Sequence, residues 1–236
     1  MNLRVATVLL IAAVVPAHGD DFIVYAPTLM PTQTELELRG YVYADARPNY
    51  GGNAAELSIA HAFTDWWKPE IYVAKYENAP SQRGGLKGYE FENTFRLTEP
   101  GKYWADVGFL ASYERKTTPG IPDAVEFGPL LAKADGRFEH IVNLIWEKEV
   151  GAGADGHYAL RYSYSGTYAA SKALRPGVEF YGRPGDHAYQ VGPIMAGEWH
   201  VPGTTGNLEY RVGVVLGINA EAPRQTWLTR LEYEFF

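Results

Sequence analysis

The stretch WLTRLEYEFF, from Trp227 to Phe236, ends the chain and alternates between two kinds of side chain. One side carries Trp227, Thr229, Leu231, Tyr233 and Phe235, and the other carries Leu228, Arg230, Glu232 and Glu234. Because successive side chains of a β-strand point to opposite faces, this pattern predicts a strand with an aromatic face and a charged face. An alternating strand of about ten residues with aromatic residues near its ends is the unit of a transmembrane β-barrel.

The same alternation recurs back along the chain. The predicted strands cover 34–44, 55–63, 70–76, 86–97, 103–114, 125–133, 137–150, 157–168, 174–182, 188–200, 208–218 and 227–236. Asp135-Gly136 between two alternating runs is a strong hairpin signal, and the stretch 78–85 is predicted to be a glycine-rich loop. The sequence therefore predicts an all-β fold, a transmembrane antiparallel up-and-down barrel of about 12 strands.

An even number of strands places both termini of the chain in the periplasm. The turns predicted on that side are 64–69, 98–102, 134–136, 169–173 and 201–206, and most of them are short, as barrel turns on that side usually are. Pro129, Pro176 and Pro193 fall inside predicted strands, where each removes a hydrogen-bond donor. They indicate either bulges or misplaced strand boundaries.

The first residues resemble a secretory signal. Arg4 gives a positive start, an apolar run follows from Val5 to Val15, and small residues around Gly19 suit a signal peptidase. The sequence thus predicts a cleaved signal peptide at 1–19, a single barrel domain at 20–236, and a periplasmic lead-in at 20–33. The alternative interpretation of the first segment is a buried N-terminal helix.

Composition agrees with an outer-membrane barrel. The 236 residues are 46% hydrophobic, yet the mean hydropathy is −0.24, which is too polar for a helical membrane protein and fits strands with one polar face. The 17 Tyr and 6 Trp residues suit interfacial belts, and the absence of cysteine favours a large hydrogen-bonded sheet over a disulfide-stapled fold. A net charge of −7 argues against nucleic-acid binding. A soluble β-sandwich is the alternative fold.

Several stretches resemble a known family. The run AELSIAHAFTDWWKPEIYVAKYE begins at Ala55, Phe95-Arg96-Leu97 leads into Glu99-Pro100-Gly101, and the chain ends RLEYEFF. These marks resemble a family of uncharacterised outer-membrane β-barrel proteins of Gram-negative bacteria, and more distantly the barrels assigned to phenol degradation by the MetA pathway. The resemblance implies the outer membrane, contact with its lipid and lipopolysaccharide, and recognition of the C-terminal strand by the assembly machinery. It supplies no catalytic residues.

The polar faces of the strands carry many charged residues. Candidates to line the lumen are Glu56, Glu70, Glu90, Glu92, Arg96, Asp106, Glu126, Arg137, Glu139, Arg161, Glu179, Arg211 and Arg230. In one interpretation, arginine–glutamate pairs fill a narrow lumen as a structural network, because buried charges are tolerated when paired. In the other, an acidic surplus lines a wet path that favours cations. The opposite faces should meet lipid through Leu57, Phe91, Phe109, Leu144, Tyr162 and Val212.

No constellation of catalytic residues emerges from the sequence. His61 and His140 lie on apolar faces without a serine on the same face of their strands, and three Met with no Cys offer little for a transition metal. The sequence predicts no cofactor and no metal site. The predicted function is a passive pore or transporter for small solutes. The alternatives are an outer-membrane enzyme acting on lipid or lipopolysaccharide, and a closed barrel that serves as a structural or interaction protein.

Overall fold

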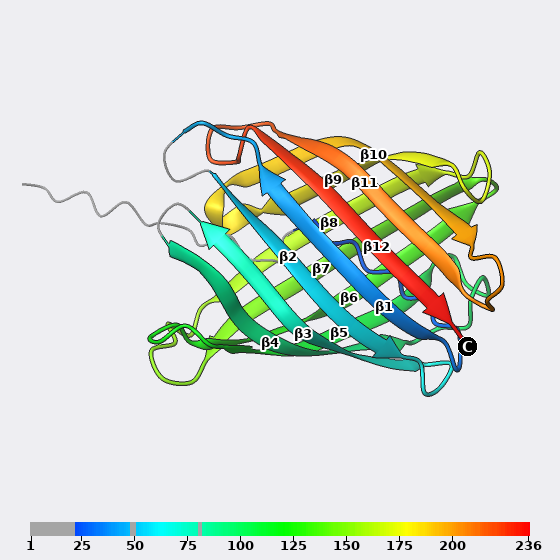
Figure 1. The fold of residues 1–236 in the computed structure, drawn as a ribbon, viewed down its shortest axis with the longest axis horizontal. Coiled ribbons are helices and arrows are strands. Elements are labelled where there is room, and N and C mark those ends of the chain that lie inside the picture. The colour runs from blue at the N-terminus through cyan, green and yellow to red at the C-terminus, as the bar shows by residue number, and fades with distance from the viewer. Residues whose placement is uncertain (1–21, 48–50, 80–81) are drawn as a thin grey trace, which may run out of the picture.

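A computed structural model describes residues 22–47, 51–79 and 82–236, so the predicted signal peptide lies outside the described residues. In this part of the chain, twelve strands form one closed antiparallel barrel in which every strand pairs with its neighbours in sequence (Figure 1). The strands are β1 Thr34–Tyr43, β2 Gly52–His61, β3 Trp67–Ala79, β4 Gln82–Arg96, β5 Asp106–Lys116, β6 Asp123–Asp135, β7 Phe138–Val150, β8 Tyr158–Tyr168, β9 Arg175–Arg183, β10 Ala188–His200, β11 Asn207–Gly217 and β12 Gln225–Phe235. A short 3-10 turn, η2 Pro184–Asp186, joins β9 to β10.

The predicted fold class and strand number are confirmed, and most boundaries differ by only a few residues. The main exception is the stretch 78–85, predicted to be a glycine-rich loop. There β3 and β4 continue to pair as far as Ala79 and Gln82, through register irregularities. Gly84 and Gly85 allow this uneven pairing, because glycine has no Cβ that must point to one face of the sheet.

The prolines within strands mark neither bulges nor false boundaries. Pro129 lies opposite Phe109, Pro193 lies opposite Val178, and the register is the same on both sides of each proline. Pro176 lies in the same way in β9, opposite Met195. The ladder therefore tolerates a missing donor at these positions without inserting a residue.

The barrel closes where β12 meets β1. Ten residue pairs join these strands, from Thr34 opposite Phe235 to Tyr43 opposite Thr226. We call the end where β1 begins and β12 finishes the terminal end, and the opposite end the loop end. The five turns predicted to be periplasmic fall at the terminal end, although the chain between β4 and β5 is longer than expected, at 97–105. Which end faces the periplasm remains a prediction.

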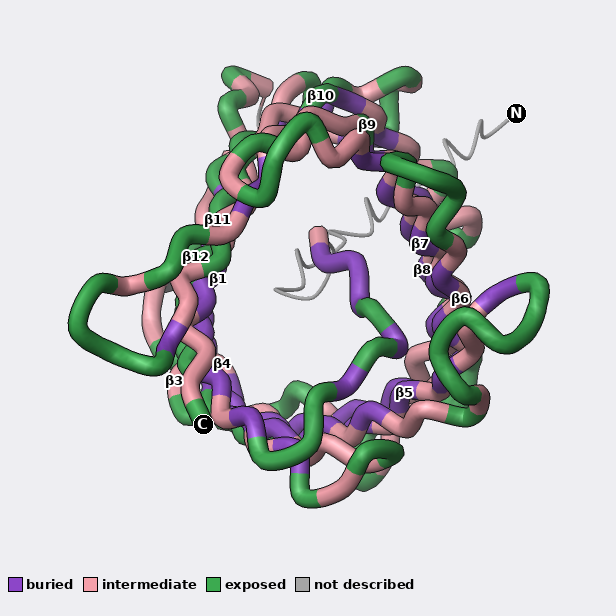
Figure 2. Tube along the Cα trace, turned by 90° about the vertical axis from the view of Figure 1, so that its right-hand side faces the viewer, coloured by how far each residue is buried: buried purple, intermediate pink, exposed green. Residues whose placement is uncertain are grey.

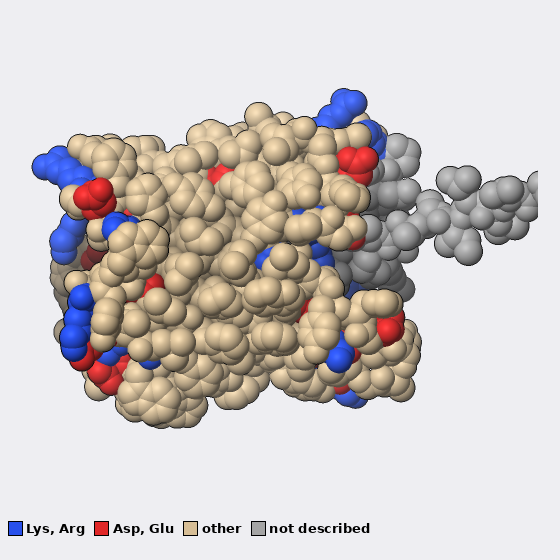
Figure 3. Space-filling view, turned by 180° about the vertical axis from the view of Figure 1, so that it is seen from behind, with Lys and Arg blue, Asp and Glu red and all other residues tan. Residues whose placement is uncertain are grey.

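The outer face of the barrel is apolar. Leu57, Phe91 and Val212 are 44%, 46% and 42% exposed. The residues on either side of Leu57 and Phe91 are buried, and those on either side of Val212 are half-buried. Charged side chains gather toward the two ends of the surface seen in Figure 3, and uncharged residues cover most of the area between them. This distribution matches a lipid-facing band flanked by polar ends, and it agrees with the predicted direction of the two faces.

No helix in the described part of the chain is both long enough and apolar enough to cross a membrane.

A stretch of the chain lies inside the barrel rather than in its wall. Residues 22–33 precede β1 and pass through the ring of strands (Figure 2). Ile23, Val24, Tyr25 and Leu29 are all buried there. The sequence places 20–33 outside the barrel as a periplasmic lead-in, and the structure instead holds its described part within the barrel. The physical reason is that its apolar side chains find apolar partners on the inner faces of the strands.

Candidate functional site

Strand register arranges charged side chains of the inner face in rows. Glu37 of β1 lies opposite Glu232 of β12, and the row continues through Glu209 and Glu198 on the next two strands. The adjacent row consists of arginines. It contains Arg39, Arg230 and Arg211. Like charges directly opposite each other are destabilising, so each row needs compensation from the other.

The two rows compensate each other through ion pairs. Arg230 pairs with both Glu37 and Glu232. Arg39 lies 3.5 Å from Glu37 along its own strand and 2.6 Å from Glu56 on β2. Arg39 also stacks over the ring of Tyr72, 4.7 Å from its centroid. Arg230 is half-buried and the other groups are buried, so the charges are stabilised mainly by partners rather than by bulk water.

Lys75 of β3 is the centre of a second set of ion pairs. Its Nζ lies 2.6 Å from Glu90, 3.2 Å from Glu114 and 3.8 Å from Glu56. The alternation within 70–76 would point Lys75 outward. A bulge between Tyr72 and Lys75 inserts an extra residue in the register and turns the lysine into the barrel. Sequence reasoning missed this residue because it continued one alternation through 70–76, whereas the bulge shifts the phase after Tyr72.

Most of the candidate lumen residues lie on the inner face. Those that are buried are Glu56, Glu70, Glu90, Glu92, Glu126, Arg161 and Glu179. Those that are half-buried are Arg96, Asp106, Glu139, Arg211 and Arg230. Arg161 pairs with Glu126 at 2.6 Å, and Arg211 pairs with Glu179. The structure thus places the glutamates that the sequence singled out on the inner face, in separate ion-paired groups.

The predicted arginine partners are partly wrong. Arg137 is exposed in the turn between β6 and β7, because Gly136 with φ +62° forms the hairpin there and the strand begins only at Phe138. Arg96 pairs instead with Asp65 in a turn at the terminal end. The cations that lie among the buried glutamates include Arg39, which the alternation also places on the polar face of its strand, and Lys75, which it does not.

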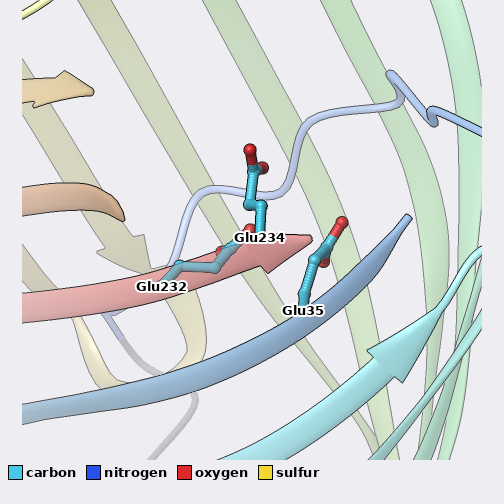
Figure 4. A group of neighbouring side chains, drawn as sticks. All are labelled: Glu35, Glu232 and Glu234. Atoms are coloured by element: carbon cyan, nitrogen blue, oxygen red, sulfur yellow. The ribbon is translucent and has the colours of Figure 1, made fainter. Parts of the chain in front are cut away.

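Three carboxylates converge near the terminal end of the seam, the line along which β1 and β12 pair. The side-chain oxygens of Glu35, Glu232 and Glu234 lie within 4.8 Å of one another (Figure 4). Glu35 is bound by Lys68 at 2.5 Å, and Glu232 is bound by Arg230. Two of the three carboxylates therefore have a cation from the protein itself. The cluster belongs to the same ion-pair network as the rows above it.

Asn143 of the wall binds the backbone of the stretch that lies inside the barrel. The backbone N–H of Tyr25 donates to Oδ1 of Asn143 at 2.8 Å, and Nδ2 of Asn143 donates to the carbonyl oxygen of Tyr25 at 2.9 Å. Ser163 on β8 donates to the same Oδ1 at 3.1 Å. Asn143 is 1% exposed, so these bonds form in a water-poor setting where their geometry matters.

Apolar side chains of the wall contact the same segment in two groups. The first group consists of Ile23, Tyr25, Leu110, Leu130 and Ile145. The second consists of Val24, Ala132, Ile141, Tyr181 and Val215, with Phe22 and Leu228 packed against it. Apolar residues on the inner face of a barrel would otherwise meet water. Together with the run Phe22-Ile23-Val24-Tyr25, they were the sequence signal that could have revealed this contact.

A polar latch ties the seam at the loop end. Arg47, after β1, donates to the carbonyl oxygens of Ala220 and Ala222, both at 2.6 Å, in the connection between β11 and β12. It also binds the carboxylate of Asp45, which accepts a further bond from the backbone N–H of Arg224. The hydrogen bond from Arg47 is the main reason why the pKa of Asp45 lies below its usual range.

We expect the Arg47→Ala variant to loosen the connection at 218–224 while the barrel stays folded. The substitution removes the bonds that span the seam, so limited digestion by a nonspecific protease should cut there first. A carboxyl group with a lowered pKa stabilises the fold above its ordinary value of 3.8 and loses this effect only as pH falls through the lowered pKa. The wild-type latch should therefore resist the protease equally at pH 7 and at about pH 4. Faster wild-type cleavage at about pH 4 would contradict this.

Comparison with known proteins decides the fold but not the family. The sequence matches no protein-family model and no curated protein. Among solved structures, the COG4313 outer membrane channel from Pseudomonas putida F1 is similar with a TM-score of 0.57 and 11% identity, covering 93% of this chain and 99% of that one. The NanC porin is similar with a TM-score of 0.55 and 10% identity, covering 85% and 99%.

The chain has the fold of outer-membrane β-barrel channels. Both similar structures are matched over nearly their whole length. The low sequence identity supports a shared fold and nothing beyond it. A 12-strand barrel of this kind implies an outer-membrane location, as the sequence predicted. The family named from the sequence motifs finds no match in these comparisons.

Proposed function

We propose that the protein is an outer-membrane channel for small solutes whose lumen is acidic and prefers cations. The observation that carries this proposal is the imbalance of charge on the inner face. Among the described residues, the buried carboxylates are Glu35, Glu37, Glu56, Glu70, Glu90, Glu92, Glu114, Glu126, Glu179 and Glu232. The buried cations are Arg39, Lys75 and Arg161, and the half-buried Lys68, Lys116, Arg211 and Arg230 compensate only part of the rest.

The terminal end of the lumen supports this selectivity. Glu198 and Glu209 continue the glutamate row beyond Glu232, and Glu234 lies beside it. These three side chains are only partly buried or are exposed, so a solute entering here meets them before it meets the paired charges deeper in the barrel. Rings of carboxylates at a pore entrance raise the local concentration of cations and repel anions. The resemblance to phenol-degradation barrels adds no solute to the proposal.

We expect the triple variant Glu198→Gln, Glu209→Gln, Glu234→Gln to reduce the cation preference measured by reversal potential in planar bilayers. The amides keep the size of the side chains but remove the negative charge at the entrance. The effect should shrink at about 1 M salt, where the Debye length is about 3 Å.

The matched control is Glu99→Gln, an exposed carboxylate in the connection between β4 and β5. It should leave the reversal potential unchanged. An anion-preferring wild-type channel would rule out the acidic-lumen proposal. A preference that survives the triple variant would place the selective charges elsewhere.

A further inference from the structure

The segment Phe22–Pro31 bridges opposite walls of the barrel. The ring of Phe22 lies 5.0 Å from that of Tyr41 on β1 and 5.3 Å from that of Tyr181 on β9. Val24 belongs to a cluster that joins Ala132 and Ile141, on β6 and β7, to Val215 on β11. Because β6 and β11 are separated by four strands on one side and by six on the other, this cluster spans the lumen instead of coating one wall.

Two small cavities lie near the segment on the inner face of the described barrel. A cavity of about 30 Å³ lies between Phe22, Ile23 and Val24 and the charged wall that carries Arg39, Glu56 and Arg230. A second cavity of about 40 Å³ lies among Glu198, Glu209 and Arg211. A site for a single water needs about 10–15 Å³, so such spaces hold only a few waters. Neither cavity is large enough for a hydrated ion.

The segment is bound to the wall but is not part of it. The ladder pairs of β1 begin at Thr34, with Phe235 on one side and His61 on the other. Residues 23–30 belong to no strand and no helix. The bonds between Tyr25 and Asn143 are those of an extended peptide docked on one amide side chain. The segment can leave without breaking a strand pair of the barrel.

We propose that the inner wall around Asn143 is a binding site for an extended apolar peptide, and that residues 22–31 occupy it as a displaceable plug that closes the channel. The proposal rests on the proposed channel function. Asn143 forms hydrogen bonds with the peptide backbone, and side chains on the inner faces of β5 to β7 pack against Ile23 and Tyr25. When the plug is displaced, solutes can contact the charged wall formed by β1 to β4 and β10 to β12.

The first test compares the full chain with a deletion of residues 22–31 in planar bilayers. The deletion should raise the single-channel conductance by at least about tenfold, because cavities that hold a few waters become one aqueous path. A synthetic peptide with the sequence FIVYAPTLMP, added to the deletion variant, should restore the block, and a scrambled peptide of the same composition should not. Heat-modifiable mobility on gels checks that both barrels are folded.

Two substitutions in the full chain guard against a deletion that fails to fold. Ile23→Asp places a charge in the apolar cluster, so it should release the plug and open the channel without altering the barrel wall. Asn143→Ala removes both bonds to the Tyr25 backbone and should raise the open fraction. Ser112→Ala is the matched control, since Ser112 faces inward on β5 outside both apolar clusters. It should leave the conductance unchanged.

The outcomes separate this proposal from the proposed function. A full chain that already conducts as well as the deletion and the Ile23→Asp variant overturns the plug and leaves the channel standing. Folded variants that stay closed without the plug overturn the plug and the channel together. An open deletion variant that prefers anions confirms the plug and overturns only the acidic-lumen proposal. Failure of the peptide to block the deletion variant overturns the binding site around Asn143.

Discussion

The Lys75→Met variant is expected to lose about 3–5 kcal/mol of unfolding free energy. The lysine Nζ lies within 4 Å of three buried carboxylates, those of Glu90, Glu114 and Glu56. Removing the lysine takes the nearest cation from Glu90 and leaves it beside Glu56 and Glu114, which keep Arg39 and Lys116 as partners. Repulsion among these buried carboxylates is then less well compensated. Urea unfolding of the refolded barrel in lipid vesicles, followed by tryptophan fluorescence, measures the loss.

The control variants for Lys75 test whether charge is the cause. Adding Glu90→Gln to Lys75→Met should recover part of the lost stability, because the amide removes one of the uncompensated charges. Lys102→Met breaks an exposed pair with Glu99 in the connection 97–105 and should cost less than about 1 kcal/mol. A Lys75→Met variant as stable as the wild type would show that the buried carboxylates are neutral without the lysine.

The Leu144→Arg variant is expected to lose about 2–4 kcal/mol of unfolding free energy when the barrel is in a bilayer. Leu144 lies in the middle of β7, opposite Tyr162, on the face away from the buried Asn143 and Ile145. An arginine there must carry its charge into the hydrocarbon region or distort the lipid around it. Unfolding in vesicles measures the effect.

The control for Leu144 lies on the same strand. Phe138→Arg, at the terminal end of β7, makes the same change at an exposed position near the polar edge and should cost about 0–1 kcal/mol. Equal costs at both positions would show that the outer face does not meet hydrocarbon. No loss at Leu144 would mean that lipid does not contact β7 at this depth.

Strand alternation alone determined the fold and the direction of its faces. A period of two is a local property, so residues such as Leu57 and Glu56 reveal their opposite faces without knowledge of any partner. Continuing this pattern through twelve segments leaves a closed barrel as the arrangement that satisfies every strand edge. The buried glutamates were found for the same reason.

Only the tertiary structure decided which charges meet and what fills the lumen. The bulge that turns Lys75 inward depends on pairing with β2 and β4, and the turn that exposes Arg137 depends on where β7 begins. The position of Phe22 to Tyr25 depends on apolar side chains from β5, β6, β7, β9 and β11, which come together only when the barrel closes. Such contacts join residues more than a hundred positions apart, as Tyr25 and Asn143 show, and no local period in the sequence encodes them.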